Sequence, residues 1–147
     1  MIKIIVVGKL NQKYLQEGID YYQKQIQTKV EWIEINDEKD VTGIAIEGNK
    51  ICAKIKDQDY VVCLAILGDQ ISSEEFANLL DEKLTYHQGD IVFVIGGSYG
   101  LSSDVLKRAN HKISFGRMTY PHQMMRLILI EQIYRGMMIL KNHPYHK

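Results

Sequence analysis

Two groups of side chains near the C-terminus could transfer protons and bind anions. His122 and Arg126 stand in the segment PHQMMR, four residues apart and therefore on one face of a helix. Tyr145, His146 and Lys147 close the chain, where residues are usually loose in solvent. Imidazole can act as a general base, and Arg or Lys can stabilise a developing negative charge. These five residues are candidates for one catalytic site, and either histidine could be the base.

Arg126 carries a charge within an apolar segment, where an unpaired cation would be unfavourable. The segment that contains it, MMRLILIEQIYRGMMIL, is apolar on several sides, so a cation there should be paired or should face a site. Glu131 and Arg135 are four apart in the orientation that favours an ordinary helix salt bridge. His122 alone could equally be a histidine that only begins the helix. A helix this apolar needs more cover than one sheet face provides, which predicts a partner subunit.

Charge is balanced over the whole chain but unevenly distributed along it. Residues 1–104 hold ten basic and seventeen acidic side chains, whereas residues 105–147 hold eight basic and one acidic. Four of the five histidines also lie in residues 105–147. Such segregation can create a local surface that attracts phosphate although the net charge is zero. A solvated basic face without a partner is the alternative.

A glycine-rich segment, VIGGSYGLS, contains a candidate ligand-binding loop. Gly96, Gly97 and Gly100 follow a buried strand and precede a short helix, so backbone N–H groups could approach a ligand that a Cβ would obstruct. The pattern is not GxGxxG, and GxxxxGK[ST] is absent, which disfavours a dinucleotide or P-loop site. A tight turn that needs positive φ would explain the same glycines without a ligand.

The elements that must position these residues alternate between strand and helix. Apolar runs predict strands at 2–8, 30–35, 60–67, 90–97 and 112–115. Helical spacing, a capping box and a first-turn proline predict helices at 13–27, 50–55, 72–84, 103–109 and 121–141. Residues 36–50 are predicted to form a loop. This order predicts an α/β domain with a mainly parallel sheet flanked by helices. Ligands bind at the carboxyl ends of such strands, so the loops after Leu67, Gly97 and Phe115 are candidate site loops.

Length and composition predict one globular domain over residues 1–147, with 46% hydrophobic side chains. Cys52 and Cys63 lack CxxC spacing, so we expect reduced thiols and no metal site. The N-terminal apolar run is too short for a signal peptide, and charged residues interrupt the longest apolar segment. We therefore expect a cytoplasmic protein that does not enter the membrane.

Four segments together resemble a known family over the whole length of the chain. MIKIIVVGKL, FVIGGSYGLS, MTYPHQMMRLILIEQIYR and HPYHK are similar to the bacterial ribosomal RNA large subunit methyltransferase H family, the 23S ribosomal RNA pseudouridine N3-methyltransferases of the SPOUT class. The resemblance implies an α/β fold with a C-terminal trefoil knot and a homodimer. It also implies S-adenosyl-L-methionine as methyl donor and, as substrate, a pseudouridine in the helix 69 stem-loop of 23S ribosomal RNA within the assembled 70S ribosome.

The resemblance also assigns roles to individual residues. It implies a cofactor pocket at Leu64, Gly96, Gly97, Phe115, Gly116, Arg117, Met118, Thr119 and Tyr120. It implies that the RNA side of the site consists of His122, Arg126, Tyr145, His146 and Lys147. Gly116 and Tyr120 depart from the serine and phenylalanine that are common in the family, which affects the details of cofactor contact.

Two other functions compete with this hypothesis. A non-catalytic ribosome-associated dimer could retain the fold, although the intact tail and cofactor loops argue against it. A nicotinamide oxidoreductase would need GxGxxG and an acidic residue about twenty positions on, and neither follows VIGG.

Overall fold

A five-stranded parallel sheet forms the centre of the computed structural model, which describes all residues 1–147. The strands are β1 (Ile2–Val7), β2 (Val30–Ile35), β3 (Tyr60–Gln70), β4 (Ile91–Ile95) and β5 (His111–Ser114), in the order β2-β1-β4-β3-β5. All four strand pairs are parallel. The predicted α/β class with a parallel sheet is thus confirmed.

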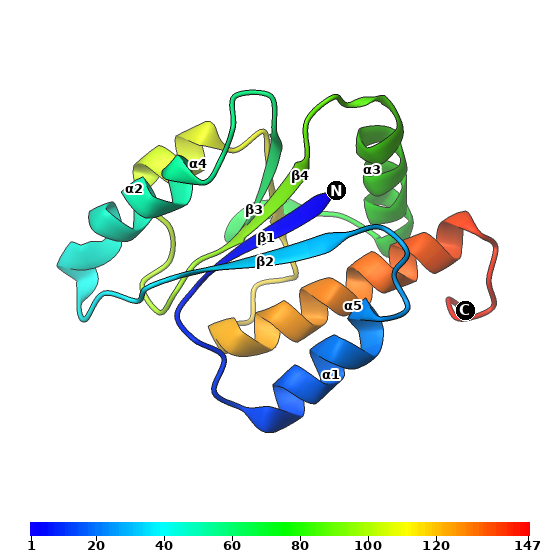
Figure 1. Cartoon of the computed structure of the whole chain (residues 1–147), viewed down its shortest axis with the longest axis horizontal. Coiled ribbons are helices and arrows are strands. Elements are labelled where there is room, and N and C mark those ends of the chain that lie inside the picture. The colour runs from blue at the N-terminus through cyan, green and yellow to red at the C-terminus, as the bar shows by residue number, and fades with distance from the viewer.

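Helices cover both faces of the sheet (Figure 1). One face carries α1 (Lys13–Gln23), α3 (Ser73–Tyr86) and α5 (His122–Leu140), and the other carries α2 (Ile44–Ala53) and α4 (Ser103–Arg108). Side chains of β1 alternate between the two faces, as they must in a strand. Ile4 and Val6 join the larger core under α1, α3 and α5, whereas Ile5 and Val7 join the smaller core under α2 and α4. No helix is both long and apolar enough to cross a membrane.

The helix after β2 begins earlier than the sequence predicts. The sequence predicts a loop at 36–50, but a 3-10 turn (Val41–Gly43) leads directly into α2 at Ile44. Gly48 speaks against a helix in the sequence because glycine usually weakens one. Here it lets α2 approach α4, since an added Cβ would collide with Ser102 Oγ. The absence of a side chain at Gly48 therefore allows the two helices to pack closely.

Two further element boundaries differ from the predictions. α1 ends at Gln23 instead of residue 27, and Ile26 still reaches the larger core from the turn that follows. β3 continues to Gln70, with an irregular register between Leu64 and Asp69 opposite Ile113 of β5. Residues 65–68 therefore bulge out of the ladder beside β5.

Two helix starts match the sequence. Ser72 Oγ accepts a hydrogen bond from the Glu75 N–H at 3.0 Å, and Glu75 Oε1 accepts one from the Ser72 N–H at 3.0 Å, so the predicted capping box is present. α5 begins at His122, directly after Pro121, whose φ of −55° suits a helix entry. His122, the first residue of α5, lies beside Gly8 at the end of β1, so α5 begins at the carboxyl end of the sheet.

Candidate functional site

The carboxyl ends of β3, β4 and β5 enclose a cavity with a volume of about 1020 Å³. We call it the large cavity. Its wall consists of residues 64–67 of β3, the glycine loop at 95–101, the segment 112–116 and the segment 118–122, with Leu106 and Met125 between them. These include the three strand-end loops that the sequence indicated. Twelve of the 22 lining residues are hydrophobic, so the cavity combines apolar walls with exposed backbone.

Eight of the nine residues predicted to bind the cofactor line this cavity. They are Leu64, Gly96, Gly97, Phe115, Gly116, Met118, Thr119 and Tyr120. Arg117, the ninth, is exposed to solvent and is not part of the wall. The apolar wall residues Leu106 and Ile113 lie outside the family motifs, because they look like ordinary core positions in the sequence.

The glycines of the loop after β4 serve different purposes. Gly100 has a positive φ of 84°, and its N–H donates to the Gly97 carbonyl at 3.1 Å, so the tight-turn explanation holds there. An added Cβ at Gly96 would lie 2.8 Å from the backbone carbonyl carbon of Gly100. At Gly97 it would lie 3.0 Å from Val7 Cγ1. A Cβ at Gly96 or Gly97 would therefore meet the protein itself before it could obstruct a ligand.

Gly116 gives the segment after β5 its direction. Its φ of 115° is one that L side chains rarely adopt, and Ser114 Oγ accepts a hydrogen bond from its N–H at 3.1 Å. The same hydroxyl donates to the Gly116 carbonyl at 3.0 Å. This local turn leads Met118 and Tyr120 along the edge of the large cavity, where Met118 is 76% exposed.

His122 lies where the large cavity meets the end of β1. It lines the cavity, and its Nε2 is 3.9 Å from the point that a Cβ of Gly8 would occupy. Asp37 Oδ2 comes within 3.8 Å of the same point from the end of β2. The histidine is half-buried, so its imidazole is accessible from the cavity.

Arg126 points away from the large cavity although it follows His122 by one turn. Its side chain is buried and forms an ion pair with Glu34 at 3.3 Å. Its Nη2 donates to the carbonyls of Val7 at 3.1 Å and Gly8 at 2.9 Å. Burial lowers the pKa of Arg126, and Glu34 opposes that effect. The expectation that this buried cation is paired is confirmed, and it fixes the end of β1 beside His122.

The C-terminal tail, residues 143–147, lies at the opposite end of α5 from His122. With 19 residues, α5 is about 28 Å long. Asn142, with a φ of 57°, ends the helix, and the His143 N–H donates to the Met138 carbonyl at 2.9 Å. In a single chain the tail residues Tyr145, His146 and Lys147 are therefore not brought together with His122.

The tail is held against its own chain by aromatic and polar contacts. The ring of Tyr145 meets Tyr134 edge-on at 4.8 Å, and its hydroxyl donates to Glu131 at 3.1 Å. Burial, with Glu131 nearby, raises the pKa of Tyr145. The guanidinium of Arg135 lies 4.8 Å from the centre of the same ring and forms the predicted ion pair with Glu131 at 2.7 Å. The tail is therefore not free in solvent.

Both ring nitrogens of His146 are occupied in this arrangement. Arg135 Nη1 lies 3.1 Å from Nδ1, and because a guanidinium can only donate, Nδ1 is the acceptor. Nε2 therefore carries the proton that it donates to Glu74 at 2.6 Å. This hydrogen bond lowers the pKa of Glu74. Docked in this way, His146 has no free nitrogen with which to accept a proton.

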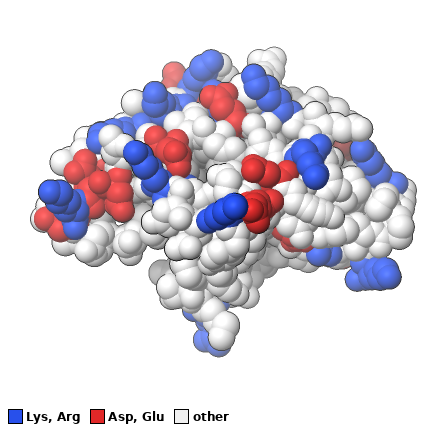
Figure 2. All heavy atoms as spheres, turned by 60° about the horizontal axis from the view of Figure 1, so that its bottom comes forward, with Lys and Arg blue, Asp and Glu red and all other residues white.

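Charge on the face that carries α1 and α5 is mixed. Blue and red side chains are interspersed there between wide uncharged areas, without a continuous basic surface (Figure 2). Two of the basic residues in the C-terminal part, Arg126 and Arg135, are paired with Glu34 and Glu131. The uneven charge distribution along the sequence therefore does not produce a basic patch on this face.

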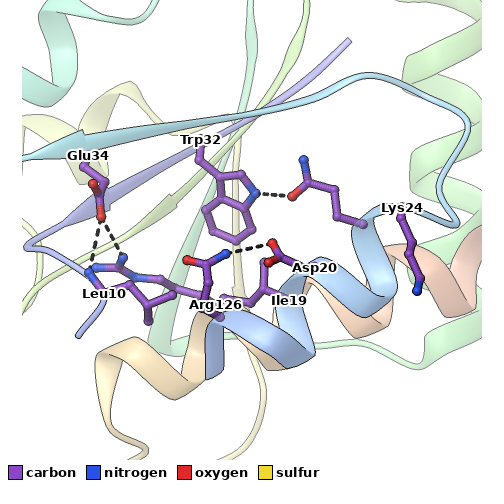
Figure 3. A pocket seen from close by; sticks show the side chains of 9 residues that line it. Leu10, Ile19, Asp20, Lys24, Trp32, Glu34 and Arg126 are labelled. Atoms are coloured by element: carbon purple, nitrogen blue, oxygen red, sulfur yellow. Dashed lines mark hydrogen bonds and ion pairs between the residues drawn. The ribbon is translucent and has the colours of Figure 1, made fainter. Parts of the chain in front are cut away.

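A second, smaller cavity of about 600 Å³ lies between α1, the edge strand β2 and the start of α5 (Figure 3). We call it the small cavity. Trp32 and Glu34 project into it from β2, and Arg126 forms part of its wall. Trp32 is inconspicuous in the sequence, because a lone tryptophan in a strand usually indicates core packing.

Comparison with known proteins identifies relatives over the whole chain. A family model described as "Predicted SPOUT methyltransferase" matches residues 1–146. A Ligilactobacillus salivarius protein named "Ribosomal RNA large subunit methyltransferase H" is 55% identical, and the match covers 99% of each chain. Proteins of the same name from Acholeplasma laidlawii and Enterococcus faecalis are 51% and 50% identical, again with 99% of each chain covered.

Solved structures of more distant proteins share the fold. A probable methylase family protein from Haemophilus influenzae superposes with a TM-score of 0.59 at 14% identity, covering 99% of this chain and 70% of that one. A ribosomal RNA small subunit methyltransferase E from Neisseria gonorrhoeae, bound to S-adenosyl methionine, gives 0.53 at 10% identity, covering 95% and 66%.

Proposed function

This chain belongs to the SPOUT methyltransferase family, and from that premise we propose that it methylates N3 of a pseudouridine in large-subunit ribosomal RNA, with S-adenosylmethionine as donor. The observation that carries the proposal is the large cavity, whose wall contains eight of the nine residues expected to bind the cofactor. Three relatives at 50–55% identity carry the name of a ribosomal RNA large subunit methyltransferase, which supports the substrate class.

The large cavity suits S-adenosylmethionine in size and chemistry. Small-molecule pockets usually have volumes of about 300–1,000 Å³, with mostly apolar walls and a few backbone donors and acceptors. Leu101, Leu106 and Phe115 offer apolar surface for an adenine ring, and the loop at Gly96 and Gly97 offers backbone groups for polar atoms. When bound, the cofactor supplies an electrophilic methyl group on a sulfonium, so the protein has to align an acceptor and remove its proton.

His122 is the general base in this proposal. N3 of pseudouridine is an imide nitrogen between two carbonyls, and it must lose its proton before it can attack. His122 lines the cavity and is half-buried, whereas both nitrogens of His146 are occupied on its own chain. Arg126 acts as a positioning residue, because its bonds to the carbonyls of Val7 and Gly8 hold the end of β1 beside His122.

The tail contributes to catalysis from the second chain of a homodimer. Within one chain, α5 separates the tail from His122 by its whole length. α1 and α5 carry uncovered apolar side chains, among them Tyr14, Tyr21 and Ile128, which a second copy would bury. If the two α5 helices pair antiparallel, Tyr145, His146 and Lys147 of one chain reach the large cavity of the other. Lys147 would then stabilise the negative charge of the pseudouridine ring after N3 has lost its proton.

Two measurements test this function. Titration calorimetry with S-adenosylmethionine should give one saturable site per chain, and absence of binding would favour a non-catalytic ribosome-associated dimer. Transfer of tritiated methyl groups should then be measured on 70S ribosomes, separate large subunits and naked RNA from a strain that lacks the enzyme. We expect transfer to the assembled ribosome, in the helix 69 stem-loop of 23S ribosomal RNA. Binding without transfer to any of the three substrates would contradict the proposed reaction.

A further inference from the structure

We propose that the small cavity is a second RNA-binding subsite, which takes a nucleobase close to the methylated nucleotide and prefers a base with an exocyclic amino group. The inference rests on the proposed function, because it assumes that RNA is the substrate. It assigns a role to a part of the molecule that the methyl-transfer chemistry does not use.

The position of the small cavity suits a nucleotide near the target. Met125 lines the large cavity and Arg126, the next residue, lines the small one. The first two turns of α5 therefore separate the two sites. An RNA strand that places its target base beside His122 can place another base in the small cavity without leaving the protein surface. Its volume of about 600 Å³ leaves room for a nucleoside.

Trp32 provides an aromatic wall on which a base can stack. Its side chain is half-buried on the edge strand β2, and its indole N–H donates to Gln23 Oε1 at 2.6 Å. This bond, drawn as a dashed line in Figure 3, favours one orientation of the ring. Proteins commonly bind unpaired bases by stacking them on aromatic side chains. A fixed, partly exposed indole needs little further ordering to do so.

Acceptor oxygens beside the indole indicate which bases would fit. Gln16 Nε2 donates to Asp20 Oδ1 at 2.8 Å, while Asp20 Oδ2 accepts no hydrogen bond from the protein. Glu34 Oε2 accepts from Arg126 and from the Leu10 N–H, while Glu34 Oε1 accepts none. Carboxylate oxygens accept hydrogen bonds from amino groups such as N4 of cytosine. Adenine, guanine and cytosine carry such a group, and uracil does not.

Two cations border the small cavity, Arg126 and Lys24. Arg126 is 2% exposed and is already paired with Glu34, so it closes the wall without offering a free donor to a ligand. Lys24 lies at the end of the cavity away from Glu34 and could meet the phosphate (Figure 3).

Trp32 makes the inference directly measurable, because it is the only tryptophan of the chain. The protein is first saturated with S-adenosylhomocysteine, so that added nucleotides cannot enter the large cavity. It is then titrated with AMP, GMP, CMP and UMP while tryptophan emission is recorded. We expect saturable quenching by the three amino-bearing nucleotides and binding of UMP that is weaker by about tenfold, the scale of one lost polar contact. Equal affinity for all four, or no quenching, would overturn the assignment.

Variants then connect the small cavity with turnover on ribosomes. Trp32→Leu and Asp20→Asn should each raise KM for the RNA substrate by about tenfold and leave kcat unchanged, because stacking on one aromatic and one hydrogen bond to a carboxylate each contribute on that scale. Trp32→Phe should fall between Trp32→Leu and wild type, since it keeps a smaller ring. Glu17→Gln is the matched control, because Glu17 is an exposed acid of α1 outside the cavity. Its KM should equal that of wild type.

The outcomes separate this inference from the proposed function. Absence of methyl transfer by the wild-type protein would contradict the function itself. Normal transfer by wild type, together with an unchanged KM in folded Trp32→Leu and Asp20→Asn variants, would contradict the subsite alone. A tryptophan emission that changes with protein concentration in the absence of nucleotide would show that a second copy covers the cavity, which also overturns the subsite.

Discussion

At the level of single residues, the two candidate histidines differ in how free their ring nitrogens are. His146 donates to Glu74 and accepts from Arg135 on its own chain, while His122 faces the large cavity at the end of β1. Proton abstraction needs an unoccupied nitrogen, so the docked tail would have to rearrange before His146 could serve. The environment of each side chain thus ranks two residues that have the same chemistry.

Replacing His122 tests this ranking. We expect His122→Ala to lower kcat for methyl transfer by about 100-fold, the loss typical of a general base, with S-adenosylmethionine affinity unchanged. Tritium transfer under saturating cofactor measures the rate, and calorimetry measures the affinity. His87→Ala is the control, because His87 is half-buried after the C-terminal end of α3, where its Nε2 lies 2.6 Å from the Gln58 carbonyl, and it lines neither cavity. Equal rates in the two variants would show that the base is another group.

A buried carboxyl on α2 gives a prediction for how stability depends on pH. Burial of Glu47, which is 5% exposed, raises its pKa above the ordinary value of 4.5; the hydrogen bond from the Glu38 N–H opposes this rise, and Asp37 adds to it. A raised pKa in the folded state means that Glu47 favours folding most at low pH, and that this contribution is lost as pH rises through its folded pKa. Glu47→Gln removes the charge but keeps an acceptor for the Glu38 N–H.

We therefore expect Glu47→Gln to have a higher Tm than wild type at pH 7, and the difference to vanish below pH 4.5. Thermal unfolding followed by circular dichroism at both pH values measures it. The exposed Glu17→Gln variant should melt like wild type at both. A lower Tm for Glu47→Gln at pH 7 would mean that its charged form is stabilised by a partner.

At the level of elements, the site depends on loops whose shape is set by close packing and backbone conformation. Gly96 is surrounded by the backbone of its own loop, and Gly116 turns the chain at a φ of 115° in open space. Both glycines line the large cavity. The same residue type thus serves two physical needs, lack of space at one position and unusual dihedrals at the other.

Alanine at each position should separate these needs. Gly96→Ala places a Cβ 2.8 Å from the Gly100 carbonyl carbon, so we expect a loss of about 1–3 kcal/mol in unfolding free energy and weaker cofactor binding. Gly116→Ala meets no atom within 4 Å, so only left-handed strain of about 1–2 kcal/mol is expected. Urea unfolding and calorimetry measure both quantities. A fully stable Gly96→Ala variant would show that the loop can shift to admit the methyl group.

At the level of the whole molecule, the proposed site is divided between two chains. One chain supplies the large cavity and His122, while its own tail docks about 28 Å away at the other end of α5. Light scattering should therefore give about twice the 17.0 kDa of one chain. The tail also packs against the larger core through Tyr145, so its removal should cost stability as well as activity.

Mixed dimers test whether the tail acts across the interface. Under this proposal a His122→Ala chain lacks the general base and a chain without residues 143–147 lacks the tail, so each homodimer should be nearly inactive. After mixing and subunit exchange, each heterodimer contains one site with an intact His122 and an intact partner tail. Half of randomly formed dimers are heterodimers, so activity should recover to about a quarter of wild type. If each tail served its own chain, no site would be intact and mixing would restore nothing.

The sequence by itself determined the features that depend on local chemistry. Buried apolar strands, the capping box at Ser72 and Glu75, the start of α5 after Pro121 and the pairing of Glu131 with Arg135 all follow from interactions within a few residues, and all are present. The family motifs also indicated eight wall residues of the large cavity, because a parallel sheet gathers its strand ends at one edge.

Tertiary structure decided the features that depend on distant partners. Only the folded chain shows that Gly48 packs α2 on α4, that Arg126 turns to Glu34 instead of the large cavity, and that Trp32 lines a second cavity. It also shows that the tail docks on α3 and α5 through Glu74 and Arg135. Each of these contacts joins residues that local pattern and spacing cannot relate, because the sheet brings them together only after the whole chain has folded.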